Sequence, residues 1–78
     1  MLDLHRVRQA ASDARRHIQQ AKNSLNQINN SFRNLGSGFT SDQKFSREYA
    51  TLAQAIKDTE RSLDKVLQAA DAVDRKAR

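Results

Sequence analysis

The 78-residue chain carries 14 Lys and Arg against 9 Asp and Glu, a net charge of +5, and it contains no Cys, Pro or Trp. The absence of Cys excludes disulfides and thiolate metal sites, and 37% hydrophobic residues with 5% aromatics are too few for a deep core. We expect a single domain, residues 1–78, with no membrane span, because no apolar run approaches the roughly 20 residues that a span requires.

The first predicted element is a helix over about residues 3–35. Asp3 is a suitable N-cap, and the segment is rich in Ala, Gln, Arg and Lys, which favour helices. Its apolar residues follow alternating steps of three and four, which is typical of a coiled-coil seam. This seam comprises Leu4, Val7, Ala11, Ala14, Ile18, Ala21, Leu25, Ile28, Phe32 and Leu35.

A turn is predicted over residues 36–40. Gly36 and Gly38 can adopt positive φ at little steric cost, so a helix can end here and the chain can reverse. Thr40 and Gln43 fit a capping box for the helix that follows. The aromatic residues around the turn are expected to form a small core that closes it: Phe32, Phe39, Phe45 and Tyr49.

The second long helix is predicted over about residues 41–77. It carries the same alternation of three and four, and its seam comprises Phe45, Tyr49, Leu52, Ile56, Thr59, Leu63, Val66, Ala70, Val73 and Ala77. The two seams predict an all-α fold, an antiparallel two-helix coiled-coil hairpin. The register that sets small residues against bulky ones places Ala21 opposite Ile56 and Arg15 near Glu60.

One seam buries little area for a chain that must order its whole length. We therefore expect two hairpins to pair into a four-helix bundle, so that the chain binds itself or another helical protein; a marginally stable monomer is the alternative. The residues expected to contact the partner lie beside the seam and at the turn: Ala10, Ala53, Leu67, Ala69 and Phe39.

Much of the excess positive charge lies in the first half of the chain. Arg8, Arg15, Arg16 and Lys22 could follow a phosphate backbone, so a small dimeric bundle that binds RNA or DNA is an alternative function. No aromatic residue is interleaved with these cations for base stacking, which favours an ordinary solvated face. A self-assembling structural subunit is a further alternative.

The sequence offers no evident active site. His5 and His17 do not share a helix face, and Gly36-Ser37-Gly38 is too short for a phosphate-binding loop. We predict a non-enzymatic protein–protein interaction module without a cofactor or metal. Because no apolar leader begins the chain, we expect it to be cytoplasmic, or secreted by a route without a cleavable signal peptide.

The turn and the seam that follows it also suggest a family. The relevant residues are Leu35-Gly36-Ser37-Gly38-Phe39, then Phe45, and then Leu52, Ile56 and Leu63. In these the chain resembles the WXG-type and LXG-associated small helical proteins of type VII secretion. The resemblance implies a hetero- or homodimer that chaperones or escorts a secreted helical partner.

Overall fold

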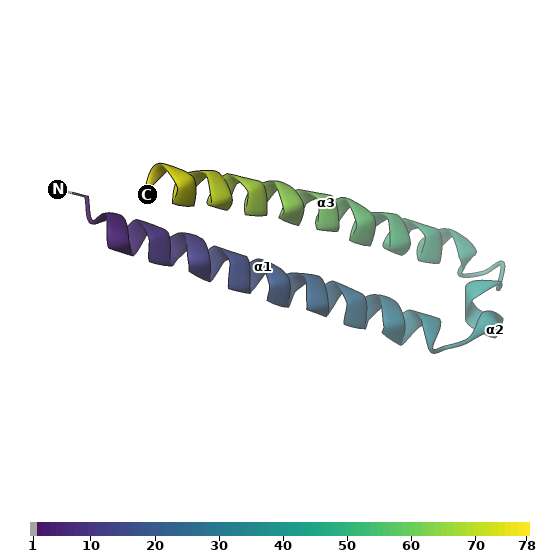
Figure 1. Cartoon of the computed structure of the whole chain (residues 1–78). Coiled ribbons are helices and arrows are strands. Elements are labelled where there is room, and N and C mark those ends of the chain that lie inside the picture. Colours follow the sequence, from purple (N-terminus) through teal and green to yellow (C-terminus); the bar gives the residue numbers. More distant parts are fainter. Residues whose placement is uncertain (1) are drawn as a thin grey trace.

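The structure, a computed structural model that describes residues 2–78, is all-helical over that range. It consists of α1 (Leu4–Arg33), the short α2 (Ser37–Thr40) and α3 (Ser46–Lys76). The two long helices lie side by side in opposite directions, with both chain ends at one end of the molecule and α2 at the other (Figure 1). The predicted helical hairpin is therefore confirmed. We call the two ends the open end and the turn end.

The start of α1 follows the predicted cap. Asp3 has extended backbone angles of φ −86° and ψ 106°, and its side chain accepts a hydrogen bond from the backbone N–H of His5 at 3.0 Å. Such a cap satisfies one of the amide groups that the first turn leaves unpaired. After α1 ends at Arg33, Gly36 adopts φ +88°, as expected of a glycine at a helix end.

The connection between the long helices is longer than predicted. Residues 37–40 form α2, and α3 begins at Ser46, not near residue 41. The predicted capping box is wrong, because the N-cap of α3 is Phe45 and no side chain caps it. Instead, the Asp42 carboxylate accepts a hydrogen bond from the backbone N–H of Lys44 at 2.7 Å, which stabilises a turn before α3.

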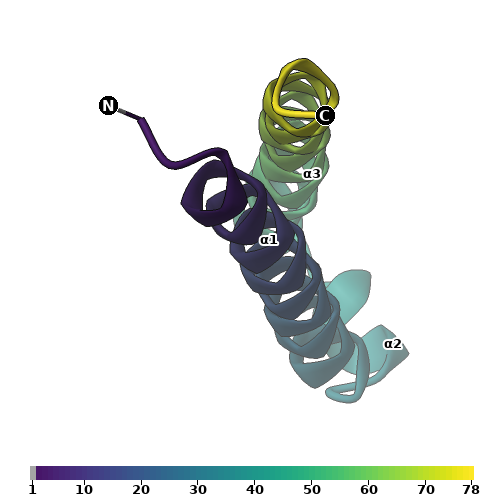
Figure 2. The same ribbon diagram turned by 60° about the vertical axis from the view of Figure 1, so that its left-hand side comes forward.

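Aromatic packing accounts for this longer connection. The ring of Phe39 on α2 lies 5.9 Å from Phe32 on α1, 5.2 Å from Phe45 and 5.9 Å from Tyr49 on α3, centroid to centroid. These distances lie in the range in which aromatic pairs attract beyond simple burial. Phe39 thus joins all three helices, and Figure 2 shows α2 beside the ends of both long helices.

The core between α1 and α3 is thin. Its buried apolar residues are Ala11, Ile18, Ile56 and Ala77, and within residues 2–78 no large side chain is completely buried. The molecule is a narrow rod of 59 × 16 × 15 Å, so most side chains remain in contact with solvent.

Beyond Ile56, every second position of the predicted α3 seam differs in the structure, whereas Leu63, Ala70 and Ala77 are half-buried or buried as predicted. Thr59, Val66 and Val73 were expected to face α1, but they are exposed. The next residue along the chain takes each place: Glu60 and Leu67 are half-buried, and Asp74 is buried. On α1, Ile28 is likewise exposed although the prediction placed it in the seam. The helix pair is rotated so that charged groups meet along one side.

Candidate partner-binding surfaces

One side of the hairpin is an ion-pair face, which comprises Arg8, Arg15 and Lys22 of α1 with Asp64, Asp71 and Asp74 of α3. The three cations recur every seven residues, so they share one side of α1. The Nε of Arg15 donates to Asp71 Oδ1 at 2.7 Å, and the Nζ of Lys22 pairs with Asp64. The predicted contact between Arg15 and Glu60 is wrong, because the carboxylates of Asp71 and Asp74 hold the guanidinium.

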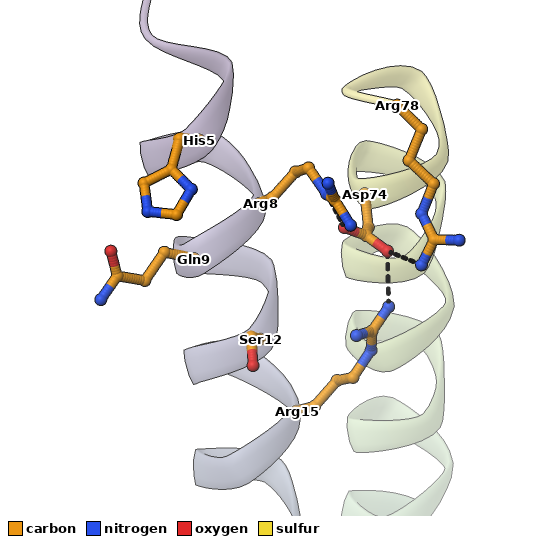
Figure 3. A pocket seen from close by; sticks show the side chains of 7 residues that line it. All are labelled: His5, Arg8, Gln9, Ser12, Arg15, Asp74 and Arg78. Atoms are coloured by element: carbon orange, nitrogen blue, oxygen red, sulfur yellow. Dashed lines mark hydrogen bonds and ion pairs between the residues drawn. The ribbon is translucent and has the colours of Figure 1, made fainter.

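Asp74 is the centre of the ion-pair face at the open end. It is 4% exposed, and its carboxylate receives hydrogen bonds from Arg15 at 3.1 Å and from Arg78 at 2.9 Å. Arg8 Nε lies 3.5 Å from its other oxygen. Figure 3 shows the three guanidinium groups approaching this carboxylate from α1 and from the end of the chain. A charge buried to this degree is tolerated because it is paired and hydrogen-bonded.

The same contacts change the acidity of the groups. The hydrogen bond from Arg15 lowers the pKa of Asp74 below its ordinary value of 3.8, Arg78 contributes in the same direction, and burial opposes them. The hydrogen bonds to Asp71 and Asp74 raise the pKa of Arg15. Both shifts favour the charged forms, so Asp74 and Arg15 are ionised as a pair at neutral pH.

A shallow hollow of about 410 Å³ lies beside this cluster, lined by His5, Arg8, Gln9, Ser12, Arg15, Asp74 and Arg78. In Figure 3, His5 and Gln9 lie on the side of α1 away from Asp74. The guanidinium groups point to the carboxylate, not to a common point in the hollow. The polar side chains therefore do not converge on a substrate as they would in an active site.

The opposite side of the hairpin is an apolar face, which comprises the exposed residues Ala10 and Ile28 of α1 with Ala55, Val66 and Val73 of α3. A helical projection at 100° per residue places these residues on the side away from the ion pairs in both helices. Ile28, Val66 and Val73 are 43%, 53% and 48% exposed. Branched aliphatic side chains are thus gathered along one side, where water covers them in the lone chain.

At the turn end, a small hollow of about 250 Å³ is lined by Phe32, Phe39, Tyr49, Leu52 and Glu48. Its walls are aromatic and aliphatic apart from the Glu48 carboxylate. In the same projection, Glu48 and Leu52 lie on the side of α3 that carries the apolar face. The hollow thus continues the apolar face to the turn.

The five residues that the sequence assigned to a partner contact do not form one surface. Ala10 belongs to the apolar face and the exposed Ala69 borders it, whereas Ala53 lies on the ion-pair side, in a hollow beside Asn29 and Glu60. Leu67 is half-buried towards α1, and Phe39 is half-buried in the aromatic cluster. Sequence reasoning missed Ile28, Val66 and Val73 as exposed residues, because their seven-residue spacing fits a seam equally well.

The four cations proposed to contact nucleic acid are all engaged in ion pairs. Arg8, Arg15 and Lys22 belong to the ion-pair face, and Arg16 pairs with Asp13 at 3.2 Å. Alternating basic and acidic groups leave little net potential along this side.

The described part of the chain, residues 2–78, has no group of three or more side chains suited to holding a metal ion. Over the same range, neither long helix has an apolar stretch sufficient to cross a bilayer. Comparison of the chain with models of protein families, with curated proteins and with solved structures finds no match.

Proposed function

We propose that this protein is a non-enzymatic docking module, and that its apolar face is covered by another helical chain, completing a four-helix bundle. The observation that carries the proposal is the contrast between the two sides of the hairpin. Ion pairs cover one side, whereas Ile28, Val66 and Val73 remain about half exposed on the other. Burial of such side chains is favourable by roughly 1 kcal/mol or more each, which gives a partner helix a reason to bind.

The thin core supports the same proposal. Only four apolar residues are buried within residues 2–78, and two of them are alanines. Ordering a chain of this length costs on the order of 1.5 kcal/mol per residue, and a single narrow seam offsets this only marginally. A second pair of helices packed on the apolar face would convert the half-exposed side chains into core.

The resemblance to small type VII secretion proteins gives the proposal a specific form. In that form the partner is a secreted helical protein, and the hairpin escorts it by covering its apolar side. The aromatic hollow at the turn end would then receive an apolar side chain of the partner, beside the Glu48 carboxylate.

Binding of RNA or DNA is the weaker alternative, because each of its candidate cations already has a carboxylate partner. Phosphate contacts would require these ion pairs to exchange, and their affinity would fall steeply between low and moderate salt. A self-assembling subunit would instead give polymers that grow with concentration.

The proposal is tested by whether the apolar face is covered in the cells that produce the protein. The chain has no Cys, so Val66→Cys introduces a single thiol on this face, and Arg61→Cys introduces a matched thiol on the outer side of α3. We expect a cell-permeant maleimide to label Val66→Cys at least ten-fold more slowly than Arg61→Cys. After denaturation both should react equally. Equal rates in the cell would overturn the proposal.

A further inference from the structure

We propose that the chain covering the apolar face is a second copy of this protein, turned so that the open end of each hairpin lies over the turn end of the other. This inference rests on the proposed docking function and names its partner. It is carried by the size of the face, by its distribution of small and bulky residues, and by its charges.

One whole side of the hairpin has the size of a stable dimer interface. A rod 59 Å long and 16 Å wide has an outline of about 900 Å² on the side that carries the apolar face, and stable interfaces bury about 800 Å² per partner. The two hairpins must therefore overlap along nearly their whole length. Among arrangements with two-fold symmetry, this leaves only those in which the long axes of the two rods are aligned. The second copy then either has its ends reversed or has like ends together.

The face is complementary to itself when one copy is reversed. On α1, the small Ala10 lies near the open end and the bulky Ile28 near the turn end. On α3, the bulky Val73 lies near the open end and the small Ala55 nearer the turn. Reversal sets Ala10 against Ile28 of the other copy and Val73 against Ala55. Joining like ends would set Ala10 against Val73 and Ile28 against Ala55, so the sizes permit both arrangements of two copies. Alternation of small and large residues is what close packing between layers requires.

One symmetry axis satisfies both pairings. Gln19 is halfway between Ala10 and Ile28, and Asp64 is halfway between Ala55 and Val73. Lys22 of α1 forms an ion pair with Asp64 of α3, and Gln19 is three residues, less than one helical turn, from Lys22. The two midpoints, Gln19 and Asp64, therefore lie at about the same height along the hairpin. A single two-fold axis that passes through both midpoints therefore produces both pairings.

Charge selects this arrangement over the one that joins like ends. Packing of open end on open end would set Arg6 of each copy near Lys76 of the other, because both residues border the apolar face in the helical projection. Reversal separates these groups and brings Lys76 within about one turn of Glu48 in the other copy. Between these ends, the positions on the apolar face carry no Lys, Arg, Asp or Glu, so the interface centre buries no unpaired charge.

Cross-linking of single-cysteine variants distinguishes the arrangements. Purified Val73→Cys is mixed with Ala55→Cys, or with Ala10→Cys, and treated with a short bifunctional maleimide. We expect the first mixture to give a covalent dimer at twice 8.8 kDa, at least five-fold more abundant than in the second. Gln54→Cys is the control for Ala55→Cys, because it lies at the same height on the outer side of α3 and should not link.

Predominant linking of Val73→Cys with Ala10→Cys would overturn the reversed orientation, because residues 10 and 73 both lie near the open end. A purified chain that stays monomeric by light scattering would overturn the second copy as the partner. That failure is distinguishable from failure of the docking function, because Val66→Cys would remain protected in cells if a different chain covered the face.

Discussion

At the scale of single residues, Asp74 determines how the two long helices meet. A carboxylate that is 4% exposed must be neutralised by neighbouring groups, and Arg8, Arg15 and Arg78 supply three guanidinium groups. Two of these belong to α1, so the rotation of α3 that buries Asp74 also sets which of its apolar residues remain exposed. Val73 is next to Asp74 in the chain, and it is turned away from α1 for this reason.

Asp74 should also make stability depend on pH in the acid range. Because its pKa in the folded chain is lowered from 3.8, first by the hydrogen bond from Arg15, its contribution is complete above that value. The contribution is lost as pH falls through the lower folded pKa. Thermal unfolding followed by circular dichroism should give a constant midpoint near neutral pH and a decline below about pH 4.

Asp74→Asn should lower the midpoint at pH 7 by several degrees and flatten the decline in acid, since the amide leaves Arg8 and Arg78 without a counter-charge and leaves Arg15 with Asp71 alone. Asp58→Asn, at an exposed site, is the matched control and should change little. If both variants keep the acid decline of the parent chain, Asp74 does not cause it.

Neighbouring residues on α3 should respond in opposite ways to the same substitution. Leu67→Asp should lower helicity and stability by about 2 kcal/mol or more, because Leu67 is half-buried towards α1. Val66→Asp should leave the circular dichroism spectrum of the hairpin unchanged, because Val66 is exposed. Urea titration of both variants, at protein concentrations low enough to keep the chain monomeric, measures the difference, and equal losses there would contradict the rotation of α3 described above.

At the scale of elements, the sequence predicted the two long helices, the Asp3 cap and the reversal at Gly36, because these follow from local chemistry. The phase of the α3 seam did not follow from local chemistry. Val66 and Leu67 are adjacent apolar residues, and either one extends an alternation of three and four. The ion pairs of Asp71 and Asp74 with α1 decide between them, and such long-range pairing is not encoded in the periodicity of one helix.

The candidate site was predictable only in part for the same reason. The contact of Ala10 with a partner stays a prediction; the structure places this residue on the apolar face. Ala53 and Leu67 lie elsewhere, because their surroundings depend on how α3 rotates against α1. The length of the connection was also missed, since α2 depends on the contacts of Phe39 with rings from both long helices.

The short helix α2 should contribute to stability through Phe39. Phe39→Ala removes three ring contacts and should destabilise the hairpin by about 2 kcal/mol, less than for a fully buried ring because Phe39 is half-buried. Phe39→Leu keeps much of the volume and should recover part of the loss. Urea titration compares the two variants, and an unchanged midpoint for Phe39→Ala would mean that α2 does not hold the helix ends together.

The two glycines of the connection offer an internal comparison. Gly36→Ala should cost about 1 kcal/mol, because φ is +88° there, although a Cβ would meet nothing within 4 Å. Gly38 lies within α2 and also has open space around a Cβ, so Gly38→Ala should be neutral or stabilising by up to about 1 kcal/mol. Equal effects in thermal unfolding would mean that the positive φ of Gly36 does not constrain the turn.

At the scale of the whole molecule, a narrow rod with two unlike sides has two sources of stability that respond to different conditions. The ion-pair face is exposed along much of its length, so salt weakens it. Burial of the apolar face depends on a partner, so it depends on protein concentration. The thin core supplies the rest of the stability, and this part depends little on salt or on protein concentration.

These dependences give a final prediction for the purified chain. If a second copy covers the apolar face, the thermal midpoint should rise with each ten-fold increase in protein concentration, because association adds to the stability of the folded state alone. Val66→Asp should abolish this rise, since an unpaired carboxylate at the interface centre would have to be buried.

Sodium chloride at about 0.5 M should leave the rise intact while lowering the midpoints of both proteins slightly, because screening acts on the ion-pair face of each. A rise that disappears in salt would instead indicate association through charged side chains, and the apolar face would then not be the contact.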